Sequence, residues 1–354
     1  MIEASFNIAK GDFVLETDVR IPSKGVTALF GPSGSGKTTF LRTVAGLERH
    51  DGCFLKFWDE EWQDDGVFVP PHKRRIGYVF QEPSLFPHLT VEKNIAYGIK
   101  RRGLRLVDQT VRKSAKSLGI DHLLDRSPSE LSGGEMQRVA IARAVGANPR
   151  VLLMDEPLSS LDEGRKREIL PYLDNLHRDL EIPVIYVSHS TDEVARLADR
   201  LIVLAEGRVE CEGPISEVLT DLAHPLAHRE DAEAIIETAV ESYDEDYGLN
   251  LLKFSGGEFI VPGAPIEVGR RVRLRLAARD VSLTLEKQKD TSILNIFSAV
   301  VTEIAPSGTS QVTVRLDAGG TPVLSRVTNR SAEVLGLKPG KEVYAQAKSV
   351  AVIR

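Results

Sequence analysis

The residues best suited to chemistry in this chain form one short glycine-rich stretch near its start. Two glycines separated by four residues precede a lysine and a threonine, which fits the phosphate-binding loop G-x-x-x-x-G-K-[ST] at every fixed position. Glycines let the backbone wrap a phosphate without a Cβ clash, while Lys37 is expected to reach the outer phosphates and Thr38 to ligate Mg²⁺. The predicted nucleotide-binding residues are Gly31, Pro32, Ser33, Gly34, Ser35, Gly36, Lys37, Thr38 and Thr39.

The segments on both sides of this loop fit the structure that the motif needs. Residues 26–30 are an apolar run that predicts a buried strand, and residues 38–45 predict a helix. Backbone N–H groups at the start of that helix would face the anion. An aromatic ring from the strands before the loop could stack on a nucleobase, with Phe13 and Phe6 as candidates. A position in the core is the alternative for either ring.

Polar side chains also end three further predicted strands. The apolar run 151–154 ends in Asp155 and Glu156, and the run 184–187 is followed by Ser188 and His189. A buried strand that ends in acids beside a phosphate-binding loop is the arrangement that holds Mg²⁺ in such enzymes. A third run, residues 75–80, ends at Gln81. His189 at a strand end favours a functional role over mere capping of the next helix.

A second surface able to face a phosphate is predicted at residues 132–134. Ser132 is a good helix N-cap, and Gly133 and Gly134 leave backbone N–H groups open at the positive end of the helix that follows. A serine before two glycines is a weak signal when it is read alone. Asp162 closes the turn that follows the acidic strand end.

The loop after Gln81 is expected to present apolar side chains to a partner. Pro83 and Pro87 prevent a continuous helix, so the segment is predicted to be a loop that exposes Leu85 and Phe86, with Leu89 beside them. We expect this loop to dock against a short helix of a transmembrane subunit. Burial of Phe86 in the core is the alternative.

The composition is that of an ordinary soluble globular protein, with 354 residues, 42% hydrophobic and 27% charged. This length suits two or three domains. The formal net charge of −6 gives no general reason to expect nucleic-acid binding. Cys53 and Cys211 lack metal-ligand spacing, no apolar run approaches the ~20 residues of a membrane span, and the start has no signal-peptide pattern. We therefore expect a cytosolic protein that reaches a membrane only through a partner.

Over roughly residues 1–220 the chain resembles the ATP-binding-cassette ATPases. The resemblance rests on five segments in order: the phosphate-binding loop, the Gln81 loop, residues 131–138, residues 152–162 and residues 188–190. In that family two cassettes pair head to tail and enclose two ATP molecules. The resemblance implies that Lys37 and Thr38 of one subunit face Ser132, Gly133 and Gly134 of the other. It assigns Thr38, Gln81 and Asp155 to Mg²⁺, Glu156 to the attacking water, His189 to the γ-phosphate and Asp162 to contact between the two sites.

The chain changes character after the cassette. Residues 221–247 carry many acids and predict an exposed helix and linker. From Leu251 onward, short alternating runs with turns predict a small β-barrel. The predicted fold is an α/β P-loop cassette with a helical subdomain over residues 1–225, a helix and linker over 226–250, and an all-β OB-like barrel over 251–354.

The barrel resembles the molbindin-like domain of molybdate-importer ATPases. The resemblance rests on residues 291–304, 327–340 and 344–350. One departure matters: that family often has an arginine where this chain has Ile293 and Leu294. Hydroxyls, backbone N–H groups and a few cations suit a divalent oxyanion. The candidate oxyanion residues are Thr291, Ser292, Ser331, Lys348 and Ser349.

Because such barrels bind anions at subunit contacts, molybdate or tungstate here would bridge two chains. A bound anion would then restrain the cassettes from closing on ATP. The alternative is a barrel that binds no anion and only dimerises. Together the resemblances imply an ATP- and Mg²⁺-dependent motor for an importer of molybdate or a similar oxyanion. It would be a homodimer on the cytoplasmic face of the membrane, bound to two permease subunits and coupled indirectly to a periplasmic or extracellular binding protein. Importers of sulfate, iron or sugars share this cassette. A soluble cassette in DNA repair or translation would be expected to carry coiled-coil insertions or tandem cassettes.

Overall fold

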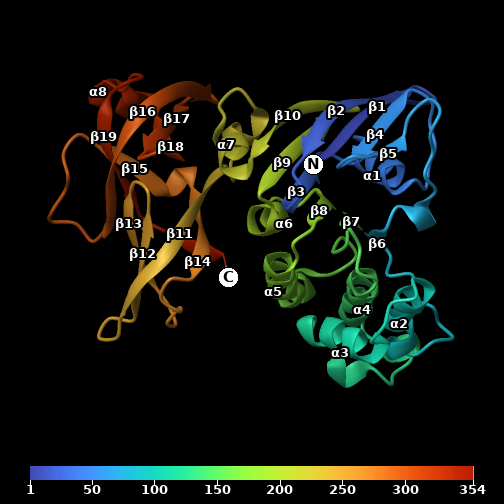
Figure 1. Ribbon diagram of the computed structural model, residues 1–354. Helices are drawn as coiled ribbons and strands as arrows, with labels where there is room; N and C mark the ends of the chain where they lie inside the picture. Colours follow the sequence, from blue (N-terminus) through green and yellow to red (C-terminus); the bar gives the residue numbers. More distant parts are fainter. Residues whose placement is uncertain (354) are drawn as a thin grey trace. The chain divides into compact units, whose positions relative to one another are not determined.

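A computed structural model describes residues 1–353 of the chain (Figure 1). The chain divides into two compact units, Met1–Glu212 and Gly213–Arg354. Each unit has its own sheet system and its own hydrophobic core.

The first unit is built on a ten-stranded sheet with the order β5-β4-β1-β2-β10-β9-β3-β8-β7-β6. The run β9-β3-β8-β7-β6 is parallel, whereas β5, β4, β1 and β2 pair antiparallel. Every residue of β7 and β8 is buried, as expected for parallel strands covered on both faces. The strands are β1 (Ile2–Lys10), β2 (Phe13–Ile21), β3 (Gly25–Phe30), β4 (Cys53–Phe57), β5 (Glu60–Gln63), β6 (Ile76–Val79), β7 (Val151–Asp155), β8 (Pro183–Ser188), β9 (Arg200–Ala205) and β10 (Arg208–Pro214).

The helices of the first unit belong to two groups. Helix α1 (Lys37–Ala45) follows the predicted phosphate-binding loop, which confirms the helix expected there. Helices α2 (Val91–Arg101), α3 (Val107–Ser117) and α4 (Gly133–Gly146) gather into a helical subdomain (Figure 1). Helices α5 (Glu163–Asp179) and α6 (Thr191–Leu197) connect β7, β8 and β9. Short 3₁₀ turns lie at Pro71–Lys73, Asp121–Leu123 and Pro128–Glu130.

The second unit contains two five-stranded antiparallel sheets, ordered β13-β12-β11-β14-β20 and β15-β19-β16-β17-β18. Both sheets contribute to one core. In it the rings of Phe254, Phe259 and Phe297 pack together, with distances of 5.0–5.4 Å between their ring centroids. This arrangement confirms the predicted all-β, OB-like fold. The elements are α7 (Ile215–Thr220), β11 (Glu233–Asp244), β12 (Leu249–Phe254), β13 (Gly257–Pro262), β14 (Arg271–Ala277), β15 (Val281–Thr284), β16 (Asn295–Ser307), β17 (Gln311–Ala318), β18 (Thr321–Thr328), α8 (Asn329–Leu335), β19 (Glu342–Ala347) and β20 (Ala351–Ile353), with 3₁₀ turns at Pro225–His228 and Ala278–Asp280.

The prediction of an acidic helix and linker over residues 226–250 is wrong. Strand β11 occupies Glu233–Asp244 and pairs with both β12 and β14. The segment is rich in acids but has the alternation of a strand, because every second residue from Ala234 to Val240 is buried: Ala234, Ile236, Thr238 and Val240. The structural division also falls after Glu212 instead of at residue 225, so α7 belongs to the second unit.

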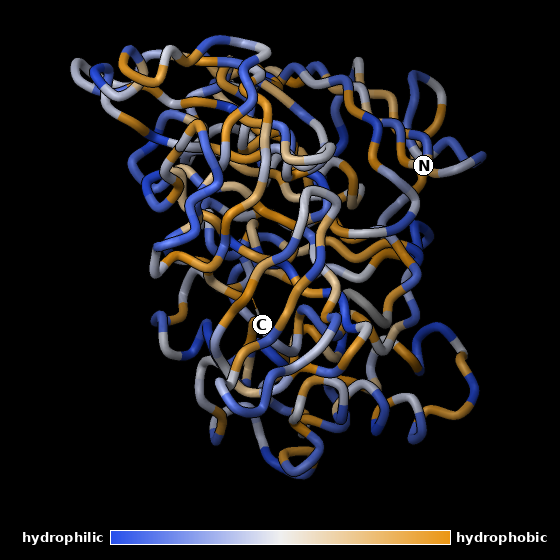
Figure 2. The backbone as a smooth tube through the Cα atoms, turned by 90° about the vertical axis from the view of Figure 1, so that its left-hand side faces the viewer, coloured by the Kyte–Doolittle hydropathy of each residue, from blue (hydrophilic) through white to orange (hydrophobic). Residues whose placement is uncertain are grey.

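No helix within residues 1–353 is long and apolar enough to cross a membrane. Hydrophobic and hydrophilic residues follow one another along the backbone (Figure 2).

Candidate nucleotide site

Three parallel strands, β3, β8 and β7, bring the predicted catalytic segments to one edge of the sheet. Phe30 at the end of β3 pairs with Ser188 at the end of β8, and Asp155 at the end of β7 pairs with Val187. The loops that leave these strands therefore start side by side. Gly31, Glu156 and His189, which are far apart in the sequence, each follow one of these strand ends directly.

The phosphate-binding loop has two positions that only glycine can fill. Gly31 has φ 155°, and a Cβ there would lie 2.0 Å from the carbonyl oxygen of Leu204. Gly36 has φ 101°, and a Cβ there would lie 2.7 Å from Leu15 Cδ1 and 3.0 Å from Phe13 Cζ. The left-handed conformation and the crowding both exclude larger residues. These glycines make the tight loop that delivers Lys37 and Thr38 to the start of α1.

Lys37 is buried at the base of the loop. Its Nζ donates to the carbonyl oxygens of Gly31 at 2.9 Å and Pro32 at 2.7 Å, and lies 3.4 Å from Ser35 Oγ. Burial lowers the pKa of Lys37, and the charges of Glu156 and Asp155 act in the opposite direction. The ammonium group is therefore held against the backbone of the loop, and the charges of the two carboxylates act on it.

The predicted magnesium ligands contribute oxygen atoms from neighbouring elements. Thr38 Oγ1 donates to Asp155 Oδ1 at 3.0 Å, and Tyr78 Oη donates to Asp155 Oδ2 at 3.1 Å. Burial raises the pKa of the Asp155 carboxyl, and its hydrogen bonds to Thr38 and Tyr78 act against this rise. A hydroxyl and a carboxylate held in contact are the hard oxygen donors that suit Mg²⁺. The residues present therefore fit the ion.

Gln81 lies in the same region but is placed less tightly. It follows β6, whose residue Val79 pairs with Met154 one position before Asp155. The side chain of Gln81 is exposed. Gln81 therefore follows a strand that lies beside the end of β7, and its role toward Mg²⁺ stays a prediction.

Glu156 and His189 form a pair across adjacent strand ends. The two side chains approach to 3.3 Å between Glu156 Oε2 and His189 Nδ1. Glu156 has φ 43°, a left-handed backbone conformation that is unusual for a side chain of this size. Hydrogen bonds from the Glu156 N–H to the Val187 carbonyl and from Ser159 Oγ to the Glu156 carbonyl hold it there. Backbone strain of this kind is maintained where a side chain must point in one direction.

A hollow of about 390 Å³ lies over the loop, and it distinguishes the two aromatic candidates. Its walls comprise residues 12–14, residues 32–35 and Glu206. Phe13 belongs to these walls and is half-buried. Phe6 is instead 2% exposed and packs in the core, 5.1 Å from the ring of Phe40. Phe13 is therefore the ring that can stack on a base, and the core alternative applies to Phe6.

We expect Phe13→Ala to weaken ATP binding by about 5- to 150-fold, because base–aromatic stacking contributes roughly 1–3 kcal/mol per base. Titration of a fluorescent ATP analogue measures the change, and Phe13→Tyr is the matched control that keeps a ring. The affinity for inorganic triphosphate should stay constant in both variants. Equal ATP affinity in the alanine variant and the wild type would contradict this assignment.

Residues 132–134 lie beside Asp162, and none of them lines the hollow. A Cβ on Gly133 would lie 3.5 Å from Leu161 Cδ2, which places residues 132–134 beside residues 161–162 of the same chain. Ser132 and Asp162 both cap helices, since Ser132 Oγ accepts from the Glu135 N–H at 3.3 Å and Asp162 Oδ1 from the Arg165 N–H at 3.0 Å. Ser132 and Asp162 are exposed, whereas Gly133 is half-buried and Gly134 is buried.

Comparison with known proteins agrees with this geometry. Residues 15–159 match the ABC transporter family and residues 291–353 match the TOBE domain family. The chain is 50% identical to the molybdenum import ATP-binding protein ModC of Aromatoleum aromaticum, over 100% of this chain and 94% of that protein. It is 51% identical to ModC of Methylococcus capsulatus, over 99% of both chains. The chain belongs to this family of ABC transporter ATPases.

Comparison with solved structures of ABC ATPases confirms the cassette fold of this chain. A dimeric ATP-binding cassette in a post-hydrolysis state with ADP and Pi is 27% identical, with a TM-score of 0.52 over 61% of this chain and 99% of that chain. A component of an ABC transporter complex from Clostridium perfringens is 29% identical, with a TM-score of 0.56 over 64% of this chain and 92% of that chain.

The apolar loop that we expect to dock against a transmembrane subunit is less exposed than predicted. Leu85 is half-buried and packs against the core of the first unit. Phe86 is also half-buried, because its ring lies 4.5 Å from that of Tyr97 and the guanidinium of Arg143 lies over it at 5.2 Å. Asn94 binds both the N–H and the carbonyl of Phe86 and so fixes the loop. The predicted exposure of Leu85 and Phe86 is therefore only partial.

The candidate oxyanion residues do not meet within one chain. Asn295 pairs with Ala347, so residues 291–292 and 348–349 lie at one end of β16 and β19. Ser331 lies in the first turn of α8, where its N–H donates to Thr328 Oγ1, and Thr328 pairs with Gln311 beside the opposite end of β16. All five side chains are exposed or half-buried. One chain alone therefore offers two separate half-sites at most.

Several residues that support the site carry no recognisable motif. Tyr78 holds Asp155, Arg74 supports the far end of α1, and Glu193 lies behind His189. A tyrosine two residues before the end of a predicted strand resembles any core position. The partners of these three side chains come from distant segments, so only the fold reveals them.

Proposed function

We propose that this chain is the ATP-hydrolysing subunit of an importer for molybdate or a similar oxyanion such as tungstate. The observation that carries the proposal is the full-length similarity to proteins named for molybdenum import, because it spans the cassette and the C-terminal unit together. The meeting of Lys37, Asp155, Glu156 and His189 at one sheet edge supports the hydrolytic part.

Hydrolysis in this site depends on charge neutralisation and on a correctly placed water. When bound, Mg²⁺ neutralises phosphate charge, held by Thr38, Asp155 and Gln81. Lys37 and the backbone N–H groups of residues 33–38 bind the phosphate oxygens. Glu156 orients the attacking water and accepts its proton, and His189 holds the Glu156 carboxylate and the γ-phosphate in place.

We infer a head-to-tail homodimer in which Ser132, Gly133 and Gly134 of one subunit complete the site of the other. The exposure of Ser132 at the start of α4 supports this arrangement, with Gly133 half-buried beside it. Asp162 lies next to them and would contact the partner at the same time. Completion of the site only on closure would couple hydrolysis to a large motion.

The decisive experiment measures ATPase activity of the chain co-purified with its transmembrane subunits, with and without molybdate. We expect turnover to rise when a molybdate-loaded binding protein is present, and a sulfate-loaded one serves as control. Stimulation by sulfate, iron or sugar carriers instead of molybdate would reassign the cargo. Absence of ATP hydrolysis under all conditions would overturn the proposal.

We expect Phe86→Asp to prevent assembly with the transmembrane subunits. The accessible side of Phe86 lies next to Tyr97, which is 39% exposed, so the two rings offer an apolar contact for a partner helix. Co-purification yield measures assembly, and the melting temperature of the isolated variant separates a docking defect from unfolding. His88→Asp on the same loop is the matched control, because His88 is exposed. Unchanged assembly of a folded Phe86→Asp variant would exclude this docking surface.

In the C-terminal unit, we infer that any oxyanion binds between two chains. Thr291, Ser292, Lys348 and Ser349 at one end of a barrel would face Ser331 of the partner's barrel. Two exposed apolar side chains flank these ends, since Leu294 is 60% exposed and Val334 is 77% exposed. Such contacts suit dimerisation whether or not an anion binds.

Calorimetric titration of the full-length chain with molybdate, tungstate and sulfate tests this inference. Saturating Mg²⁺–ADP must be present so that the phosphate-binding loop does not take up the anion. Lys348→Ala should abolish the heat of binding, while Lys289→Ala, which changes another exposed lysine, should not. No heat with any of the three anions would leave the barrel as a dimerisation module.

We place the assembled protein at the cytoplasmic face of the membrane, held there by its permease and coupled only indirectly to a binding protein outside the cell. Sedimentation of the chain with membranes should depend on co-expression of the transmembrane subunits.

A further inference from the structure

A buried carboxylate behind the site has no part in the roles assigned above. Glu193 of α6 is 4% exposed. Its Oε2 accepts hydrogen bonds from Tyr186 Oη at 2.9 Å and from Ser188 Oγ at 2.8 Å, while its Oε1 lies 3.4 Å from Lys166 Nζ. A buried charge is tolerated only when it is paired and hydrogen-bonded, and Glu193 meets both conditions.

The partners of Glu193 are in the protonation states that this arrangement needs. Tyr186 is fully buried, and burial together with the Glu193 charge raises the pKa of its hydroxyl well above the ordinary value. Burial lowers the pKa of Lys166, but the charge of Glu193 and the contact with Glu163 outweigh this, so the net shift is upward. Tyr186 therefore donates and Lys166 stays charged at neutral pH.

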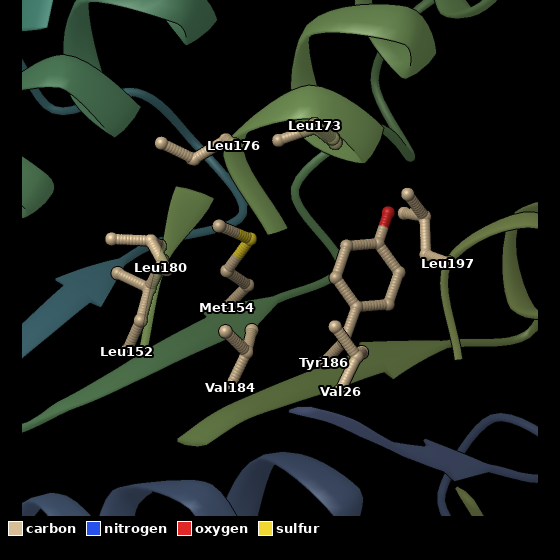
Figure 3. A pocket seen from close by; sticks show the side chains of 9 residues that line it. All are labelled: Val26, Leu152, Met154, Leu173, Leu176, Leu180, Val184, Tyr186 and Leu197. Carbon is tan, nitrogen blue, oxygen red and sulfur yellow. The ribbon is translucent and has the colours of Figure 1, made fainter. Parts of the chain in front are cut away.

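One end of this network holds the loop of His189. Ser188 precedes His189; its Oγ donates to Glu193 and accepts from the Ser190 N–H at 3.0 Å. Ser190 Oγ in turn accepts from the Glu193 N–H at 3.4 Å. The residues on both sides of His189 are thereby fixed to Glu193. Figure 3 shows the Tyr186 ring within an apolar wall and its hydroxyl at the edge where Leu197 of α6 lies.

The other end holds the segment of Asp162. Lys166 lies in the first turn of α5, and its N–H donates to the Asp162 carbonyl at 3.0 Å. The ammonium group of Lys166 on α5 forms an ion pair with Glu193 on α6. A continuous set of contacts thus runs from Asp162 through Lys166, Glu193 and Ser188 to His189.

We propose that Glu193 is a positioning residue that makes the Asp162 segment and the His189 loop move as one body. This inference rests on the proposed function, in which Asp162 meets the partner subunit and His189 meets the γ-phosphate. Arrival of the partner at Asp162 would then set the position of His189 and, through the 3.3 Å contact, of Glu156. Glu193 touches no reacting atom, so it should affect turnover more than ATP binding.

The test compares steady-state kinetics and ATP affinity for a set of single variants of the full-length chain. Glu193→Gln keeps the size and one acceptor oxygen but loses the charge opposite Lys166. We expect it to lower kcat by roughly tenfold or more, with KM and ATP affinity within about twofold of wild type. Glu163→Gln is the matched control, because Glu163 is the other carboxylate near Lys166 and its side chain is 72% exposed. It should leave kcat unchanged.

A second variant and a double variant keep the proposal falsifiable if Glu193→Gln unfolds. Ser188→Ala removes only the direct tie to the His189 loop and should reproduce the loss in kcat. Lys166→Met combined with Glu193→Gln should lose no more kcat than the worse single variant, because both act through one network. Wild-type kcat in a folded Glu193→Gln or Ser188→Ala variant would overturn the proposal, as would equal losses in kcat and ATP affinity. Failure of the proposed function is distinct, since the wild-type chain would then show no ATPase activity.

Discussion

Glu156→Gln is expected to lower ATP turnover by at least ~10²-fold while ATP binding is retained, because a positioned general base contributes a factor of this order. The amide keeps the shape of the side chain but cannot accept the proton of the attacking water. The variant should therefore accumulate closed, ATP-bound dimers. Turnover assays and size-exclusion chromatography with and without ATP measure the two effects.

The local structure explains why this effect should be specific to Glu156. Its side chain is 20% exposed, it pairs with His189, and its left-handed backbone is fixed by hydrogen bonds to Val187 and Ser159. Asp155, one residue earlier, points instead toward Thr38 and Tyr78. The adjacent carboxylates are therefore aimed at different partners, which suits the separate roles proposed for them.

Lys37→Ala gives the matched contrast, because it should lose nucleotide affinity by removing the charge that faces the phosphates. Glu163→Gln serves as the neutral control, since it is a glutamate near the site that contacts only Lys166 in the described network. Wild-type turnover in Glu156→Gln would show that another group activates the water.

The proximity of the candidate hydrolytic residues could be predicted from the sequence because parallel strands align their ends. Each of the runs before Gly31, Glu156 and His189 is an apolar strand, and strands that alternate with helices join one parallel sheet. The order of the motifs therefore predicts that these residues lie at one edge of the sheet. What the sequence did not determine was which aromatic ring faces the nucleotide. Phe6 and Phe13 lie on paired strands, and the structure distinguishes them because Phe6 is buried in the core whereas Phe13 lines the hollow over the loop.

The prediction for residues 226–250 was wrong because their acidic composition was given more weight than the alternation of their buried residues. The many acids of residues 226–250 suggested a solvated helix, yet the alternation of Ala234, Ile236, Thr238 and Val240 is that of a strand. The prolines beside Leu85 and Phe86 correctly predicted a loop, but they carry no information on Asn94, which folds that loop inward. The separation of Ser331 from Lys348 could not be predicted either, because it depends on the register of β16 with two neighbours.

Arg74 is a further residue that the sequence did not single out. Its guanidinium is fully buried and donates to the carbonyl oxygens of Val69 at 2.6 Å and of Thr43 and Val44 at 2.8 Å. Burial lowers the pKa of Arg74 to about 10, so the group is still charged at neutral pH. Thr43 and Val44 lie in the last turn of α1, where the helix dipole favours a cation. Gly46 makes room for it, since a Cβ there would lie 2.6 Å from Arg74 Cζ.

Arg74→Ala is expected to lower the free energy of unfolding of the first unit by about 3–5 kcal/mol, because it leaves several buried carbonyl oxygens without donors and opens a cavity. For a unit of this size the melting temperature should fall by about 6–20 °C. Differential scanning calorimetry measures the shift, and Lys73→Ala, one residue away and exposed, should change stability by less than about 0.5 kcal/mol. Since α1 carries Lys37 and Thr38, ATP affinity should fall with Arg74→Ala as well. An unchanged melting temperature would mean that water replaces the guanidinium at the end of α1 without cost.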